Sequence, residues 1–224
     1  MARTKLADRA IPSYTKGEEI MNMVSHIIGG TLGIVATVLC VIFAAINKNV
    51  YGVVSGAIFG ASLIMLYTMS SIYHGLNPNG KAKKVFQVLD HCSIFLLIAG
   101  SYTPFCLCTL REYSPALGWT IFGIIWGFAI LGITLNAIDL KSFKTFSMIC
   151  YLIMGWCIIF RATLLPKLLT VNGFVLLLLG GIFYTVGAVL YGLGKKKKWM
   201  HSVFHICCVI ASLLQFFCIL FYVM

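Results

Sequence analysis

The stretch Trp199–Met224, WMHSVFHICCVIASLLQFFCILFYVM, decides the fold class of this chain. It contains no Asp, Glu, Lys or Arg, and four consecutive lysines come directly before it. A helix needs about 20 apolar residues to cross the hydrocarbon core of a bilayer, so this stretch is long enough to span a membrane. Its histidines, His201 and His205, therefore need a reason, because ionisable groups inside a membrane span are costly and usually functional.

Six further apolar runs of similar length precede this stretch. The 224 residues are 60% hydrophobic and only 10% charged, a balance that argues against a water-facing globule. The runs are continuously apolar and do not alternate, which argues against a membrane β-barrel. We therefore predict an all-α integral membrane protein, a bundle of seven transmembrane helices. The expected spans are Val24–Ile46, Val50–Tyr73, Val85–Leu110, Leu117–Ile138, Phe146–Leu165, Val171–Leu193 and Trp199–Met224.

The connections between the runs are short, so we expect no separate soluble domain. Residues 1–23 are expected to form a short cytoplasmic segment with an interfacial helix, and residues 24–224 the seven-helix domain. Thr15 and Glu18 have the spacing of a capping box, which predicts a helix that begins near Lys16. No small-residue cleavage pattern precedes the first run, so we expect the first helix to stay in the mature protein.

The positions of the cations predict the orientation. Thirteen of the 17 Lys and Arg residues fall on the side that includes the N-terminus, and four fall on the other side. By the positive-inside rule, the N-terminus is cytoplasmic and the C-terminus is outside. This one-sided distribution also argues against nucleic acid as the partner of a chain with a formal charge of +11. The run Lys195–Lys198 suits anionic lipid headgroups, although a topology signal explains it equally well.

With this orientation, all five histidines lie toward the cytoplasmic end of the bundle. His201 and His205 are one helical turn apart on one face, a spacing that lets two imidazoles share one tetrahedral ion or simply pack. Ser70 and His74 repeat the spacing on the second span. Asp90 is the only acidic residue within a predicted span, and an isolated buried carboxylate needs a cation, a metal or a strong donor nearby.

A Zn²⁺ ion held by His74, His201 and His205 would account for both features. Three neutral imidazoles leave a fourth position for a water molecule, as in catalytic zinc sites. Asp90 could bind, orient or deprotonate that water. Imidazole also suits copper, nickel and iron, so the ligand set alone leaves the metal open.

Other polar residues in or near the spans have simpler readings. Glu18, Asn22, Ser25 and His26 fall near one helical face and could line the cytoplasmic mouth, although capping and packing explain them too. For His26 and His91 an interfacial role is the simpler one. The nine cysteines read as small packing residues. Cys208, which shares the face of His201 and His205, is the one with an open role.

Four segments resemble the signature blocks of a known family. GEEIMNMVSHIIGG, SSIYHGL, LDHCSIFLLIAGSYTPF and HSVFH are similar to blocks of the hemolysin III family, the bacterial branch of the progestin and adiponectin receptor (PAQR) superfamily. The resemblance covers about Gly17 to Met224, in order. It implies seven helices, a cytoplasmic N-terminus, an outer C-terminus and a multi-pass position in the bacterial cell (inner) membrane. It also implies zinc ligands at His74, His201 and His205.

The same resemblance implies an activity. The wider superfamily, which includes the alkaline ceramidases, is thought to hydrolyse lipid amides at this zinc site. The matching positions give Asp90 as the group that takes the proton and Ser70 as the group that positions the water or donates to the oxyanion. We therefore expect a zinc-dependent hydrolase of a lipid-like amide or ester that enters from the inner leaflet, with membrane lipids as its surroundings.

Two alternatives stay open. In the first, the chain is a non-enzymatic regulator of membrane state, and zinc only joins the helices. In the second, it forms pores, as the family name suggests, although no amphipathic stripe suited to oligomeric insertion is present. The receptor branch has a long cytosolic region before its first helix, whereas this chain has about twenty residues there. Receptor partners are therefore not expected.

Overall fold

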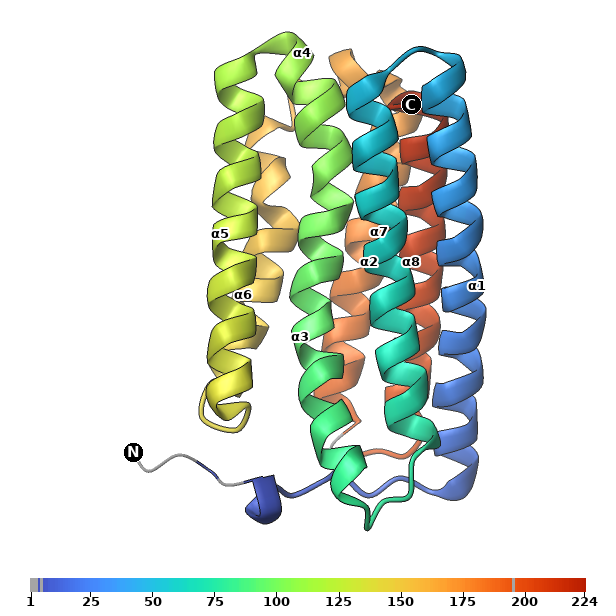
Figure 1. Cartoon of the computed structure of the whole chain (residues 1–224), viewed down its shortest axis with the longest axis vertical. Helices are drawn as coiled ribbons and strands as arrows, with labels where there is room; N and C mark the ends of the chain where they lie inside the picture. The colour runs from blue at the N-terminus through green and yellow to red at the C-terminus, as the bar shows by residue number, and fades with distance from the viewer. Residues whose placement is uncertain (1–3, 5, 195) are drawn as a thin grey trace.

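The computed structural model describes residues 4, 6–194 and 196–224, and its described part contains seven helices long and apolar enough to cross a membrane. The same residues contain no strand, so the predicted all-α bundle is confirmed. The start of α1 (Lys16–Ile46) and the C-terminus lie at opposite ends of the bundle (Figure 1). Which end is cytoplasmic stays a prediction, and three of the cations behind it, Arg3, Lys5 and Lys195, lie outside the described residues.

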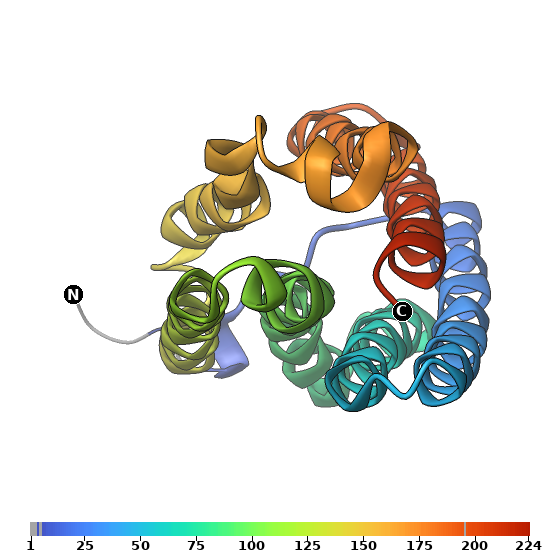
Figure 2. The same cartoon turned by 90° about the horizontal axis from the view of Figure 1, so that it is seen from above.

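The helices run side by side and close into a ring. Seen along the bundle, the order around the ring is α1, α2, α3, α5, α6, α7 and α8, with α8 returning beside α1 (Figure 2). The elements are η1 (Leu6–Asp8), α1 (Lys16–Ile46), α2 (Val50–Gly75), α3 (Lys81–Pro104), the π-helix η2 (Phe105–Leu110), α4 (Arg111–Tyr113), α5 (Pro115–Asp139), α6 (Lys144–Trp156), the 3-10 helix η3 (Cys157–Arg161), α7 (Leu165–Leu193) and α8 (Met200–Tyr222).

The outer surface of the ring is mainly apolar, and many of the polar side chains are buried in its interior. Ile46, Ile130 and Val171 are more than half exposed, as are several other large apolar side chains. In contrast, Asn22 and Asn136 are fully buried. A continuous apolar exterior of this extent is not stable in water, so the distribution fits a bilayer as the solvent.

The N-terminus of α1 is capped as the sequence predicts. The Glu18 backbone N–H donates to Thr15 Oγ1 over 3.3 Å, and the Thr15 N–H donates to Glu18 Oε2 over 2.9 Å, which completes the capping box. The helix continues from Lys16 through the first apolar run without a break. Glu18 Oε1 also accepts the backbone N–H of Trp199 at 2.6 Å, so this helix start holds the residue before α8.

Two of the predicted span boundaries differ in their outcome. The expected start at Val171 agrees with a break in α7 at Thr170, whose φ is 60° and ψ is 167°, and Thr170 Oγ1 accepts the Gly173 N–H at 3.4 Å. The span predicted to run to Leu165 ends earlier, because α6 stops at Trp156 and the helical span ends with η3 at Arg161. The Ile158 N–H instead donates to the Tyr102 hydroxyl at 3.0 Å and the chain tightens into η3.

A close approach between α1 and α2 fixes the position of α8. A Cβ atom at Gly29 would lie 2.5 Å from Tyr67 Cδ1, so only glycine lets the Tyr67 ring pass. The Tyr67 hydroxyl then donates to the Cys208 carbonyl at 3.0 Å and lies 2.7 Å from Ser212 Oγ. These contacts join three helices at the depth of the histidines on α8.

Candidate metal centre

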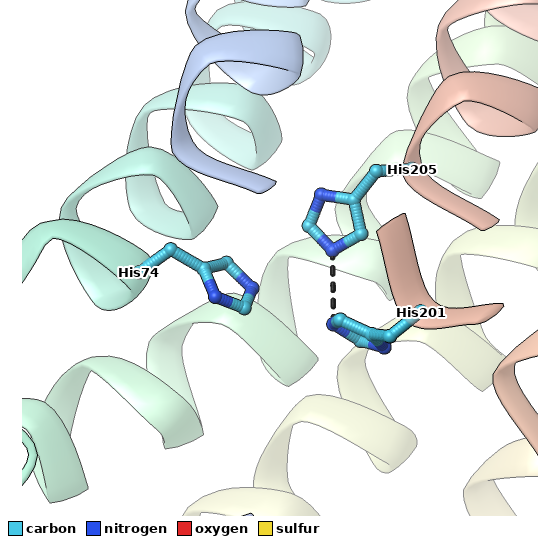
Figure 3. A group of neighbouring side chains, drawn as sticks. All are labelled: His74, His201 and His205. Carbon is cyan, nitrogen blue, oxygen red and sulfur yellow. Dashed lines mark hydrogen bonds between the residues drawn. The ribbon is translucent and has the colours of Figure 1, made fainter. Parts of the chain in front are cut away.

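Three histidines from two helices meet inside the ring, near the end where the N-terminal segment lies. His74 is next to the last residue of α2, and His201 and His205 lie in the first two turns of α8. Their three side chains point toward one another (Figure 3). One ligand atom from each lies within 4.8 Å of the others, and all three residues are buried.

The two histidines of α8 have the separation that a shared ion requires. His201 Nε2 and His205 Nε2 are 3.0 Å apart. Two imidazole nitrogens on one tetrahedral zinc, each 2.0–2.1 Å from it, are about 3.3 Å apart. The prediction that His201 and His205, at positions i and i+4, lie close enough to share one ion therefore agrees with the distance between their nitrogens.

A carboxylate orients the third histidine. Glu19 Oε2 lies 2.6 Å from His74 Nδ1, and Glu19 Oε1 accepts from Lys83 Nζ at 2.7 Å. Lys83 is fully buried and also donates to the Leu76 carbonyl at 3.2 Å. Since the ion pair with Lys83 keeps Glu19 ionised, the carboxylate must accept, and the His74 proton sits on Nδ1.

This arrangement leaves the Nε2 lone pair of His74 for another ligand. His74 Nε2 is buried and has no hydrogen-bond partner among the described residues, and the same holds for His205 Nδ1. A histidine whose one nitrogen donates to a carboxylate while the other faces a common point is typical of a metal ligand. The three histidines therefore fit a metal ion, with Nε2 as the ligand atom of each.

Side chains of α1 hold the start of α8 in place. Asn22 Oδ1 accepts from Ser202 Oγ at 2.7 Å, and Ser202 directly follows His201 in α8. Glu18, Asn22, Ser25 and His26 are all buried, so their predicted common face is confirmed. The contacts indicate a structural role for Glu18 and Asn22, next to the histidines.

The other two histidines lie nearby and make different contacts. The His26 ring stacks on the His205 ring with 3.7 Å between centroids, and both His26 nitrogens are buried without a partner among the described residues. His91 Nδ1 lies 2.8 Å from the Gln87 carbonyl, and its Nε2 lies 3.5 Å from the Tyr191 hydroxyl. Neither belongs to the group of three that could hold an ion.

A cavity of about 320 Å³ lies beside the three histidines, which is within the range of small-ligand sites. His201 and His205 line it, and so do Ser70 and Asp90. Asp90 Oδ2 lies 3.8 Å from His91 Nδ1, and no hydrogen bond joins Asp90 or Ser70 to the three histidines in the part of the chain that is described. The cavity wall thus combines the two other predicted site residues with the candidate ligands. Cys208 also lines it but is outside the group of three.

The N-terminal segment crosses the end of the ring (Figures 1 and 2), and its residues Arg9, Ala10, Pro12 and Tyr14 line the cavity. The Tyr14 ring stacks on the His201 ring, with 4.8 Å between centroids and 19° between planes. Burial raises the pKa of Tyr14 well above its ordinary value, so its hydroxyl stays protonated at neutral pH. Tyr14 therefore covers the histidines with a neutral ring that can donate a hydrogen bond.

Glu19, Lys83 and Tyr14 were not predicted from the sequence. Glu19 precedes Asn22 by three residues and His26 by seven, so its spacing could have placed it on the face toward the other helices. The prediction chose the neighbouring Glu18 because the capping box named it. Lys83 and Tyr14 carried no signal, because each acquires its role only from contacts with distant residues.

A family model described as Haemolysin-III related matches residues 14–216. The chain is 43% identical over 207 residues to Hemolysin-3 of Bacillus cereus, which covers 92% of each chain. It is 40% identical over 209 residues to the Hemolysin-3 homolog of Bacillus subtilis (strain 168), covering 93% of this chain and 96% of the relative. The Monocyte to macrophage differentiation factor of Homo sapiens is 24% identical over 166 residues, which covers 72% of this chain and 67% of the relative. The resemblance read from the four sequence blocks is thereby confirmed.

Proposed function

This chain belongs to the haemolysin-III related family, and we propose that it is a membrane-embedded zinc protein that hydrolyses a lipid-like amide or ester. The reaction would take place at the cytoplasmic leaflet of the bacterial cell membrane. Water would add to the carbonyl carbon, and cleavage of the C–N or C–O bond would give a carboxylic acid and an amine or alcohol.

The observation that carries the proposal is the convergence of three imidazoles beside a cavity that is lined by two of them, His201 and His205, and by the carboxylate of Asp90. The His201 and His205 nitrogens lie 3.0 Å apart, and Glu19 turns the His74 Nε2 toward them. A zinc ion bound there supplies a Lewis acid and an activated water. Among the described residues the group has no fourth protein ligand, so it resembles catalytic zinc sites more than closed structural ones.

The other residues of the cavity would each have a separate task. Asp90 would accept the proton of the attacking water, because it is the one carboxylate among the described residues that line the cavity. Ser70 would donate to the oxygen that becomes negative as the carbonyl is attacked. The apolar wall, which includes Ile94, Leu97 and Ile98, would hold an acyl chain and exclude bulk water.

The experiment is a hydrolysis screen with purified protein in lipid nanodiscs. Single-chain N-acyl amides and acyl esters are offered, and the released fatty acid is measured by mass spectrometry. We expect at least one substrate to be cleaved by the zinc-loaded protein, cleavage to stop on chelation, and added zinc to restore it. A zinc-loaded, folded protein that cleaves no member of the panel would contradict the proposal.

Replacement of Glu19 by glutamine is expected to weaken metal binding by about 10–100-fold, since loss of a partner that orients a metal-bound histidine has effects of this size. The amide removes the charge that holds the His74 Nδ1 proton and leaves Lys83 without its counter-ion. Zinc affinity is measured by competition with a chelator of known affinity. Glu112→Gln is the matched control, because Glu112 is exposed, pairs with Arg111 and contacts none of the three histidines. Equal affinity for both variants would contradict the role given to Glu19.

One observation favours a second candidate function, a regulator of membrane state with a structural zinc site. The three histidines join α2 to α8, two helices that are far apart in the sequence, so an ion between them would also fix the bundle. In that case chelation would lower the melting temperature and no lipid would be cleaved. Pore formation, to which the printed name of the Bacillus cereus relative points, predicts dye release from liposomes on addition of purified protein.

A further inference from the structure

The cavity beside the histidines contains a buried cation, two of whose nitrogens have no partner among the described residues. Arg9 lines the cavity from the N-terminal segment and is 8% exposed. Its Nε and Nη1 atoms are buried and have no hydrogen-bond partner, and no carboxylate forms an ion pair with it among the described residues. An unpaired guanidinium is costly to bury, so its position calls for an anionic partner.

The other charged residues around the cavity also favour an anionic ligand. Lys141 and Lys144 line it from the turn before α6 and from the first residue of α6. Against these three cations the described part of the lining contains a single carboxylate, Asp90. The cavity is therefore positive overall, even with every histidine neutral.

The cations and the apolar wall occupy different ends of the cavity. Arg9, Lys141 and Lys144 belong to the end of the bundle at which α1 begins, together with the covering residue Tyr14. Farther along the helices the lining is mainly apolar and aromatic, with Leu97, Ile98, Tyr102, Gly155 and Trp156. A ligand that matches this wall carries an oxyanion at one end and an apolar chain at the other.

We propose that Arg9, with Lys141 and Lys144, binds the oxyanion headgroup of a single-chain lipid, a phosphate or a carboxylate, whose chain lies along the apolar wall. The planar guanidinium offers two parallel N–H groups to such an oxyanion. This headgroup site involves none of the three histidines. The statement that the bound lipid is also the substrate rests on the proposed function, whereas its binding does not.

The test measures lipid binding to the full-length protein after its metal has been removed with a chelator. The probes are a single-chain lysophosphatidic acid, a fatty acid and a neutral monoacylglycerol of equal chain length, and inorganic phosphate alone. Binding is followed by isothermal titration in detergent micelles. We expect one of the two anionic lipids to bind at least about tenfold more tightly than the neutral one, and which one it is names the headgroup. If inorganic phosphate bound with the same affinity as the anionic lipid, the proposal of a lipid ligand would be wrong and the ligand would be a free anion.

Variants of matched charge locate the site. Arg9→Gln is expected to lower the affinity for the anionic lipid by about tenfold or more and to leave the neutral lipid unchanged. Arg161→Gln removes the same charge from an exposed residue outside the cavity lining and is expected to bind like the native chain. Lys141→Gln, on an exposed turn, is expected to give a smaller loss and serves as the test if Arg9→Gln does not fold.

Two results would overturn the headgroup site. Equal affinity of Arg9→Gln and the native chain for the anionic lipid would mean that Arg9 takes no part in binding. Equal affinity of the native chain for anionic and neutral lipids would mean that the cations do not distinguish lipids by the charge of the headgroup. Because the protein contains no metal in these measurements, failure of hydrolysis in the nanodisc screen leaves the result unaffected, and the two proposals fail separately.

Discussion

Replacing any one of His74, His201 and His205 with alanine is expected to reduce the zinc content of the purified protein from about one ion per monomer to a small fraction. Each residue supplies one of three ligand atoms that lie within 4.8 Å of one another. Loss of one ligand leaves two, and the affinity is expected to fall by more than the 10–100-fold typical of a lost orienting partner. Elemental analysis of each variant, with protein quantified on the same sample, measures the effect and also identifies the metal.

His91→Ala is the matched control for this measurement. His91 lines the same cavity, but its nitrogens face the Gln87 carbonyl and the Tyr191 hydroxyl. The variant is therefore expected to retain its zinc. His26→Ala is expected to retain it as well, since His26 stacks on His205 and is outside the group of three. A native chain without stoichiometric metal, under extraction conditions shown not to remove it, would contradict the metal centre.

The membrane fold was readable from the sequence because lipid imposes a simple rule. Each span must be predominantly apolar over about 20 residues, so the lengths of the apolar runs were enough to predict the seven helices. The ends of the helices were harder to predict where a backbone N–H group can bond either within its own helix or to a side chain of another helix. The end of α6 depends on a bond between the Ile158 N–H and the Tyr102 hydroxyl, which lies on another helix. Hydropathy contains no information about that bond.

The candidate ligands were readable for a related reason. A polar side chain in an apolar span stands out, and the spacing of His201 and His205 named one helical face. Glu19 and Lys83 did not stand out, because they lie near helix ends, where charged residues are ordinary. Arg9 was counted only as a topology signal. Its burial in the cavity follows from the path of the N-terminal segment across the ring, which no local pattern encodes.

Asp90→Asn is expected to lower kcat of the proposed hydrolysis by about 10²–10⁴-fold, the range that general acid–base groups contribute. The asparagine has nearly the same shape but does not accept a proton at neutral pH. Zinc content is expected to stay at the native value, because Asp90 is not in the group that could hold the ion. KM is expected to change little, since the acyl chain of the proposed substrate would contact the apolar wall and the loss concerns the reacting water.

The control separates the chemistry of Asp90 from its charge. Asp8→Asn removes an equal charge from the exposed 3-10 helix η1, outside the cavity lining, and is expected to leave kcat unchanged. If Asp90→Asn loses zinc together with activity, Asp90 holds the ion and is not the proton acceptor. Full turnover by Asp90→Asn at native zinc content would mean that another group takes the proton. His26 would then be the next residue to replace, because it lines the same cavity and neither of its ring nitrogens has a partner among the residues that the structure describes.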